Sequence, residues 1–174
     1  SNAGRFTSVP NLSGDAAVAA GIDAVFASYG ETVSAGEQVF VQPFLTDVSA
    51  SGVAFSREPS SGAPYIVINY DLTGDTAAVA SGTGQNTETF YFWQFGQNPP
   101  DGVLGGVIAL LREVEKLLGH DDLDIEFAVS AGHGLCLLQA RPLFVAAAPV
   151  DPKRHREILT GIARRIADAA REHP

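Results

Sequence analysis

Hydrophobic and polar positions change their period several times along the chain, and each change marks an expected element. Apolar residues recur at helical spacing over residues 15–29, 103–118 and 153–171, which predicts three helices. Between the first two helices the apolar spacing falls to two residues, which is typical of strands. We expect these strands at Gln38–Leu45, Gly52–Ser56, Tyr65–Tyr70, Thr76–Ala80 and Thr87–Trp93.

A hairpin is expected between the second and third helices. Its strands are Leu123–Val129 and Leu135–Arg141, joined by a turn at Ala131–Gly134. In the first strand, apolar residues alternate with Asp124 and Glu126, so the two carboxylates should share one face. Together these elements predict an α+β fold, in which helices cover a mixed, mainly antiparallel sheet.

Charge and composition narrow the classes of function. The 174 residues carry a net charge of −9, and 16 of the 20 acidic residues lie within residues 1–149. Such an acidic body repels a phosphate backbone, so we expect no nucleic-acid partner. No apolar run approaches the roughly 20 residues that cross a bilayer, so we expect no membrane partner. A single cysteine, Cys136, fits a reducing compartment, and we expect a cytoplasmic protein.

The residues with the clearest chemistry lie on the predicted hairpin. If its strands pair through the turn, Asp124 and Glu126 lie beside Gln139 and Arg141 on one face. Carboxylate and amide oxygens suit Mg²⁺, and a guanidinium can bind a phosphate through two parallel hydrogen bonds. The alternative is an amphipathic hairpin whose outer face carries ion pairs and is exposed to water.

Three stretches resemble the ATP-binding domain of the phosphoenolpyruvate synthase and pyruvate phosphate dikinase family, which has the ATP-grasp fold. They are GRFTSVPNL near the start, VFVQPFL followed by SGVAFSREPSSG, and DIEFAVS followed by LCLLQARPL. The stretches occur in the family's order and span the chain to about Leu143. The resemblance implies the carboxy-terminal lobe of an ATP-grasp domain.

The resemblance also implies roles for individual residues. Residues at the positions that hold Mg²⁺ and the triphosphate of ATP are Asp124, Glu126 and Gln139, and Arg141 matches the arginine that stabilises the transferring phosphate. Residues of the hinge strand that faces adenine are Val41, Gln42 and Phe44. Arg57 matches a basic position near the phosphates, and the alternative is a surface ion pair with Glu58.

The expected organisation follows from the same resemblance. Residues 1–3 look like the remnant of a cleaved tag, 4–145 form the nucleotide-binding fragment, and 146–174 form a linker and a basic helix. The implied partners are an upstream ATP-grasp lobe and downstream phosphohistidine and substrate domains. Tyr70–Asp75 departs from the family's glycine-rich segment, which favours a second interpretation, a non-catalytic scaffold that retains the fold.

Overall fold

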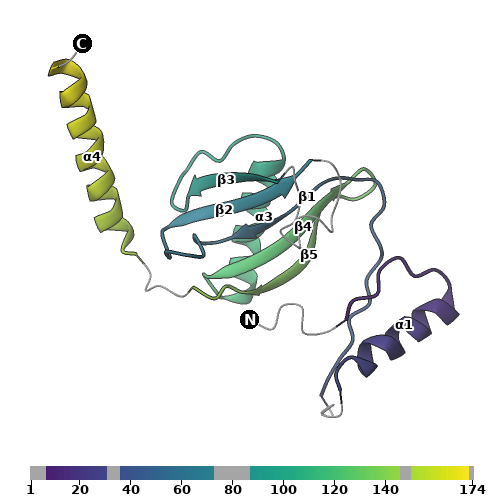
Figure 1. Ribbon diagram of the computed structural model, residues 1–174. Helices are drawn as coiled ribbons and strands as arrows, with labels where there is room; N and C mark the ends of the chain where they lie inside the picture. Colours follow the sequence, from purple (N-terminus) through teal and green to yellow (C-terminus); the bar gives the residue numbers. More distant parts are fainter. Residues whose placement is uncertain (1–6, 31–35, 73–86, 146–149, 173–174) are drawn as a thin grey trace. The chain divides into compact units, whose positions relative to one another are not determined.

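The computed structural model describes residues 7–30, 36–72, 87–145 and 150–172, and its chain divides into two compact units, residues 1–46 and 47–174 (Figure 1). The elements are α1 (Asp15–Ala27), β1 (Val48–Phe55), β2 (Tyr65–Asp71), β3 (Glu88–Trp93), α3 (Val103–Leu118), β4 (Leu123–Ser130), β5 (Gly134–Pro142) and α4 (Pro152–Glu172). All three predicted helices are confirmed. The predicted strand Thr76–Ala80 lies outside the described residues.

The first unit is built around α1. Gly21 is the buried residue of this helix, and the side chain of Leu12 lies where a Cβ at that position would stand. A larger residue at position 21 would therefore displace Leu12. After the helix, the Tyr29 hydroxyl donates a hydrogen bond of 2.7 Å to the Gln38 carbonyl oxygen. These contacts hold the start of the unit against the helix.

The predicted strand Gln38–Leu45 is wrong, because these residues form neither a strand nor a helix. Three of their apolar side chains are exposed, with Phe40 at 82%, and the other two, Val39 and Leu45, are half-buried. A strand requires hydrogen bonds to a neighbouring strand, and Pro43 has no N–H group to donate. Alternation of apolar and polar residues favours a strand, but it does not predict whether a neighbouring strand is available for pairing.

The second unit contains a five-stranded sheet in the order β3-β2-β1-β4-β5, with every neighbouring pair antiparallel. The strands predicted at Tyr65–Tyr70 and Thr87–Trp93 are confirmed within a residue at each end. The strand predicted at Gly52–Ser56 is the second half of a longer β1, whose first half contains serine and alanine. The coarse α+β class with an antiparallel sheet is thus confirmed.

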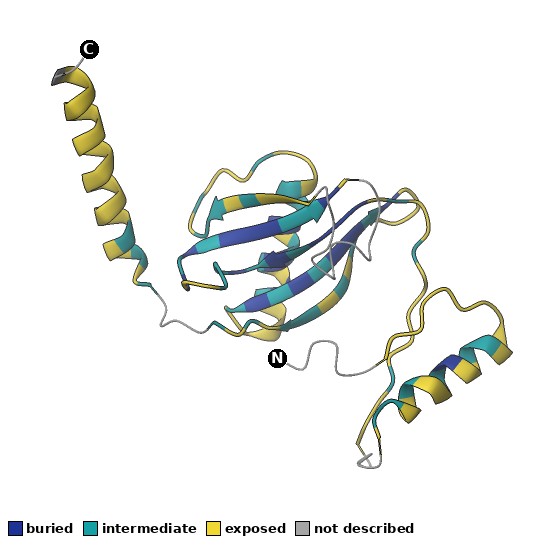
Figure 2. Cartoon of the chain, in the orientation of Figure 1, coloured by how far each residue is buried: buried dark blue, intermediate teal, exposed yellow. Residues whose placement is uncertain are grey.

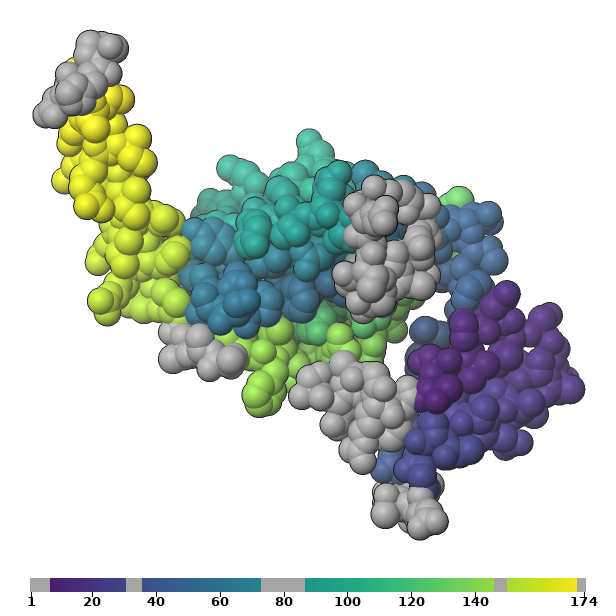
Figure 3. Space-filling model, in the orientation of Figure 1, coloured from purple at the N-terminus to yellow at the C-terminus, as the bar shows by residue number. Residues whose placement is uncertain are grey.

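One face of the sheet packs on α3, and the core lies between them (Figure 1). Fully buried residues of α3 contact alternate positions of the strands, among them Ile68, Ile125 and Phe127. Gly52 on β1 lies opposite Phe127, and a Cβ there would meet the Phe127 ring at 2.6 Å. Figure 2 shows the buried positions of the sheet concentrated in β1, β2 and β4, and in Figure 3 the blue, teal and green atoms of this unit form one continuous surface.

The last helix, α4, contacts the sheet at its first turn. His155 Nε2 lies 3.1 Å from the Tyr65 hydroxyl oxygen, and the His155 ring stacks on Trp93 with the ring centres 5.9 Å apart. The Arg156 guanidinium lies 5.6 Å from the centre of the Trp93 ring, a cation–π contact. Beyond this turn the helix is exposed, including its apolar residues Ile158 and Ile166 (Figure 2).

Candidate functional site

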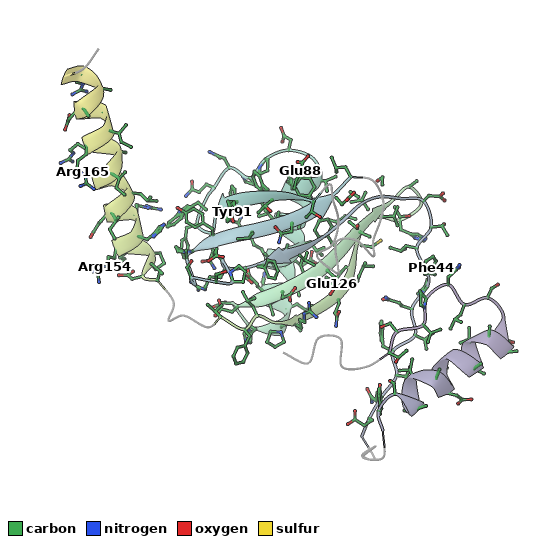
Figure 4. The ribbon with its side chains drawn as sticks, viewed as in Figure 1. Phe44, Glu88, Tyr91, Glu126, Arg154 and Arg165 are labelled. Carbon is green, nitrogen blue, oxygen red and sulfur yellow. The ribbon has the colours of Figure 1, made fainter. Side chains whose placement is uncertain are left out.

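Four of the residues predicted from the sequence lie together on the hairpin of β4 and β5. The register places Asp124 opposite Arg141 and Glu126 opposite Gln139, as the sequence predicted. Residues opposite each other in an antiparallel pair share a face, and this is the face turned away from α3. Figure 4 shows Glu126 on β4, with α3 behind the strands.

The local sequence explains why these polar groups are held firmly. Leu123, Ile125 and Phe127 are buried on the α3 side, so the alternate residues must point to the other side. Between Glu126 and Phe127 the pairing with β5 shifts by one residue, a β-bulge at the end of the polar group. The buried face therefore fixes the position of both carboxylates.

Arg141 forms ion pairs with both carboxylates. Its Nε atom donates to Asp124 Oδ2 at 2.7 Å, and its Nη2 atom lies 3.4 Å from Glu126 Oε1. The side chains are 12% exposed for Asp124, 24% for Glu126 and 31% for Arg141. Ion pairs with this little exposure are screened less by salt than pairs on an open surface.

One atom of the site has no hydrogen bond. Asp124 Oδ1 is buried and accepts no hydrogen bond from any part of the chain that the structure describes. A buried carboxylate oxygen in this condition is costly, because it has lost its water without gaining a partner. It is therefore an oxygen that a bound cation would satisfy.

The residues present fit Mg²⁺ with phosphate rather than a metal held by protein alone. The described residues contain no group of three or more histidine, cysteine, aspartate or glutamate side chains that could hold a metal ion. Mg²⁺ does not need such a group, because it keeps waters and binds one or two carboxylates together with substrate phosphates. Asp124, Glu126 and the amide oxygen of Gln139 would supply that set of hard oxygen ligands.

Arg57 makes an ion pair that neither sequence interpretation included. Its Nε atom lies 2.8 Å from Asp122 Oδ1, and the Arg57 side chain is largely buried. The alternative pairing with Glu58 is wrong, because that carboxylate accepts hydrogen bonds from Ser60 and Ser61 in its own loop. Those bonds, chiefly from Ser61, lower the pKa of Glu58.

Sequence reasoning missed Asp122 because it precedes the strand. Asp122 is two residues before Asp124. Because the Leu143 N–H donates to the Asp122 carbonyl oxygen, the pairing of the hairpin extends beyond the start of β4 and the end of β5. Asp122, Asp124 and Glu126 thus recur every second residue, and that spacing was a usable signal. The polar surface is one carboxylate longer than predicted.

Glu115 on α3 lies near this end of the hairpin, and its pKa is raised. Burial is the main cause, the charge of Asp121 adds to it, and a hydrogen bond from Ser56 opposes it. A carboxyl whose pKa is higher in the folded state favours folding at low pH. That contribution is lost as the pH rises from about 4.3, the ordinary value, through the raised pKa.

Replacing Glu115 with glutamine should therefore leave stability nearly unchanged at pH 4 and raise it, relative to the wild type, at pH 7. Thermal unfolding of both proteins across this pH range measures the difference. An equal difference at the two pH values would contradict the assigned shift. Glu113→Gln on the same helix, where the side chain is exposed, serves as the control.

The residues predicted to contact adenine belong to the other unit. Val41, Gln42 and Phe44 lie in the irregular segment after α1, and Val41 and Phe44 are exposed. Figure 4 labels Phe44 in this segment. Their expected place in a strand is wrong, and their proposed contact with adenine stays a prediction.

The segment Tyr70–Asp75, whose sequence departs from the family pattern, is described by the structure only at residues 70–72. Tyr70 donates a hydrogen bond from its hydroxyl to Glu88, which raises the pKa of Tyr70, and Asp71 is buried at the end of β2.

None of the described helices is long and apolar enough to span a bilayer. A scan of protein-family models and a search of curated proteins gave no match to this chain.

Proposed function

We propose that this chain is the metal- and phosphate-binding part of an ATP-grasp domain, in a phosphotransferase similar to phosphoenolpyruvate synthase and pyruvate phosphate dikinase. On this proposal, a longer protein supplies an upstream lobe with further cations and a downstream histidine domain that accepts the phosphate. The observation that carries the proposal is the register of the hairpin. It brings Asp124 and Glu126 together with Gln139 and Arg141 on one face of the sheet.

Charge explains why the site needs both a metal and another lobe. Within residues 1–149 the basic residues number 5, too few to balance the four negative charges of ATP and 16 acidic side chains. Mg²⁺ supplies positive charge to the phosphate oxygens when it is bound. Asp124, Glu126 and Gln139 would hold it, and Arg141 would donate hydrogen bonds to the phosphoryl group as charge develops on its oxygens. The isolated 174 residues should therefore show no kinase activity.

One observation favours a second candidate, a scaffold that retains the fold without the chemistry. Arg141 forms ion pairs with both carboxylates, so part of the polar group is already neutralised within the chain. An ion-paired hairpin face of this kind also occurs without any role in ligand binding. The scaffold predicts no nucleotide binding even in the longer protein.

Binding of Mg·ATP to the longer protein, with its upstream lobe, separates the two candidates. We expect Asp124→Ala and Glu126→Ala each to weaken binding by about a hundredfold, about 2.8 kcal/mol. Titration calorimetry measures this, with Asp168→Ala on α4 as a control that removes an exposed carboxylate far from the hairpin in sequence. Unchanged affinity in both variants, or no binding in the wild type, would reject the proposed function.

A further inference from the structure

Resting on the proposed function, we propose that Arg141 hinders the binding of free divalent cations to the Asp124–Glu126 pair. The guanidinium holds both carboxylates when no ligand is bound, and phosphate oxygens draw it away when a polyphosphate arrives. The ligand of this site is therefore a divalent cation together with a polyphosphate, and either one alone binds weakly.

The guanidinium of Arg141 lies where a metal held by the two carboxylates would lie. Arg141 Nε and Nη2 face Asp124 Oδ2 and Glu126 Oε1, one oxygen from each carboxylate. A metal bridging the two carboxylates needs oxygens from the same pair of groups. Asp124 Oδ1 is buried without a hydrogen-bond donor, so a divalent cation could reach it only if the guanidinium moved. A cation beside that oxygen would lie next to the guanidinium, and like charges repel strongly where water is largely excluded. Metal and guanidinium therefore compete for one place.

Arg141 must leave the two carboxylates when a metal binds to them. A guanidinium has five N–H donors and keeps its charge, so a displaced Arg141 needs new acceptors. Among the described residues of this face, the other paired carboxylate, Asp122, already accepts from Arg57 at 2.8 Å. Phosphate oxygens match the planar fork of the guanidinium and can accept two bonds at once. Phosphate thus removes the obstacle to the metal, and each ligand strengthens the binding of the other.

The experiment measures binding of Mn²⁺, a paramagnetic substitute for Mg²⁺, to the 174-residue chain by electron paramagnetic resonance. We expect Arg141→Met to tighten binding of Mn²⁺ alone by about tenfold or more, a coupling within the ordinary range between sites. Arg165→Met, which removes one positive charge from exposed α4, should leave the affinity unchanged (Figure 4). Adding Asp124→Asn to Arg141→Met should abolish the gain, because the metal then loses a carboxylate.

The outcomes separate this proposal from the proposed function. If Arg141→Met binds Mn²⁺ no more tightly than the wild type, while Asp124→Asn weakens binding, the role proposed for Arg141 is rejected. The metal site proposed at the two carboxylates is then retained. If Mn²⁺ binds to none of the proteins, the role proposed for Arg141 is rejected, and the titration of the longer protein with Mg·ATP decides the proposed function. Arg141→Gln, which keeps a hydrogen-bond donor for Asp124, repeats the test if the methionine variant does not show a cooperative melt.

A second measurement tests the role of phosphate. Equilibrium dialysis of the wild-type chain should retain more Mn²⁺ when sodium tripolyphosphate is present, and Arg141→Met should lose this increase. Retention that does not rise with tripolyphosphate in the wild type overturns the claim that phosphate draws Arg141 away. A rise of equal size in Arg141→Met overturns it as well, because the effect would then not pass through the guanidinium.

Discussion

Replacing Phe127 with alanine should cost roughly 3–5 kcal/mol of unfolding free energy, which is the usual cost of removing a buried phenylalanine. Phe127 is 1% exposed, and its ring packs against Gly52 and the α3 side of the core. Since β4 also carries Asp124 and Glu126, loss of this contact should loosen the candidate site together with the fold. Urea unfolding followed by circular dichroism measures the change.

Phe144→Ala provides the control, because that side chain is 82% exposed. It should change the unfolding free energy by no more than about 0.5 kcal/mol, as exposed substitutions usually do. Phe127→Leu keeps most of the apolar volume and should fall between the two. A loss in Phe127→Ala no larger than in Phe144→Ala would show that the sheet and α3 do not pack as described.

Replacing Arg141 with methionine should slow phosphoenzyme formation in the longer protein by about 10³-fold, the lower end of the effect of an arginine on a transferring phosphate. The reason is that the guanidinium would stabilise charge that develops on the phosphoryl oxygens. The same variant leaves Asp124 and Glu126 without the cation that bonds them here. Rapid-quench measurement of phosphohistidine at saturating Mg·ATP separates this chemical effect from binding.

Arg141→Lys serves as the conservative variant and Arg165→Met as the control for this measurement. Lysine keeps the charge but cannot form two parallel hydrogen bonds, so it should restore only part of the rate. Arg165→Met removes a positive charge from α4 and should leave the rate unchanged. A rate in Arg141→Met within about threefold of the wild type would contradict the catalytic role, since removing a needed oxyanion donor costs about a hundredfold or more.

The elements that could be predicted from the sequence are those whose burial is local and regular. Val103–Leu118 was predicted with its observed bounds because its apolar residues recur at helical spacing and Gly119 ends it in the left-handed conformation. Gln38–Leu45 has an equally apolar pattern, but it pairs with no strand among the residues that the structure describes. Pairing depends on distant residues, so periodicity alone could not exclude it.

The candidate site was predictable where the alternation and the turn together set the register. That is why Asp124, Glu126, Gln139 and Arg141 meet as expected. Ion pairs on the outer face of the hairpin were expected as the alternative, but their partners were not named, because side-chain pairing depends on rotamers and on residues outside the motif. These pairs are also the observations that carry the role proposed for Arg141.

On the proposed function, the β4–β5 hairpin binds a metal together with phosphate. Titration of Mg·ATP into the longer protein, carried out beside the double variant Asp124→Ala, Glu126→Ala, tests this binding. We predict saturable binding in the wild type and none in the double variant at the same concentrations, with a cooperative melt in both proteins. Equal affinity in the two folded proteins would contradict the claim.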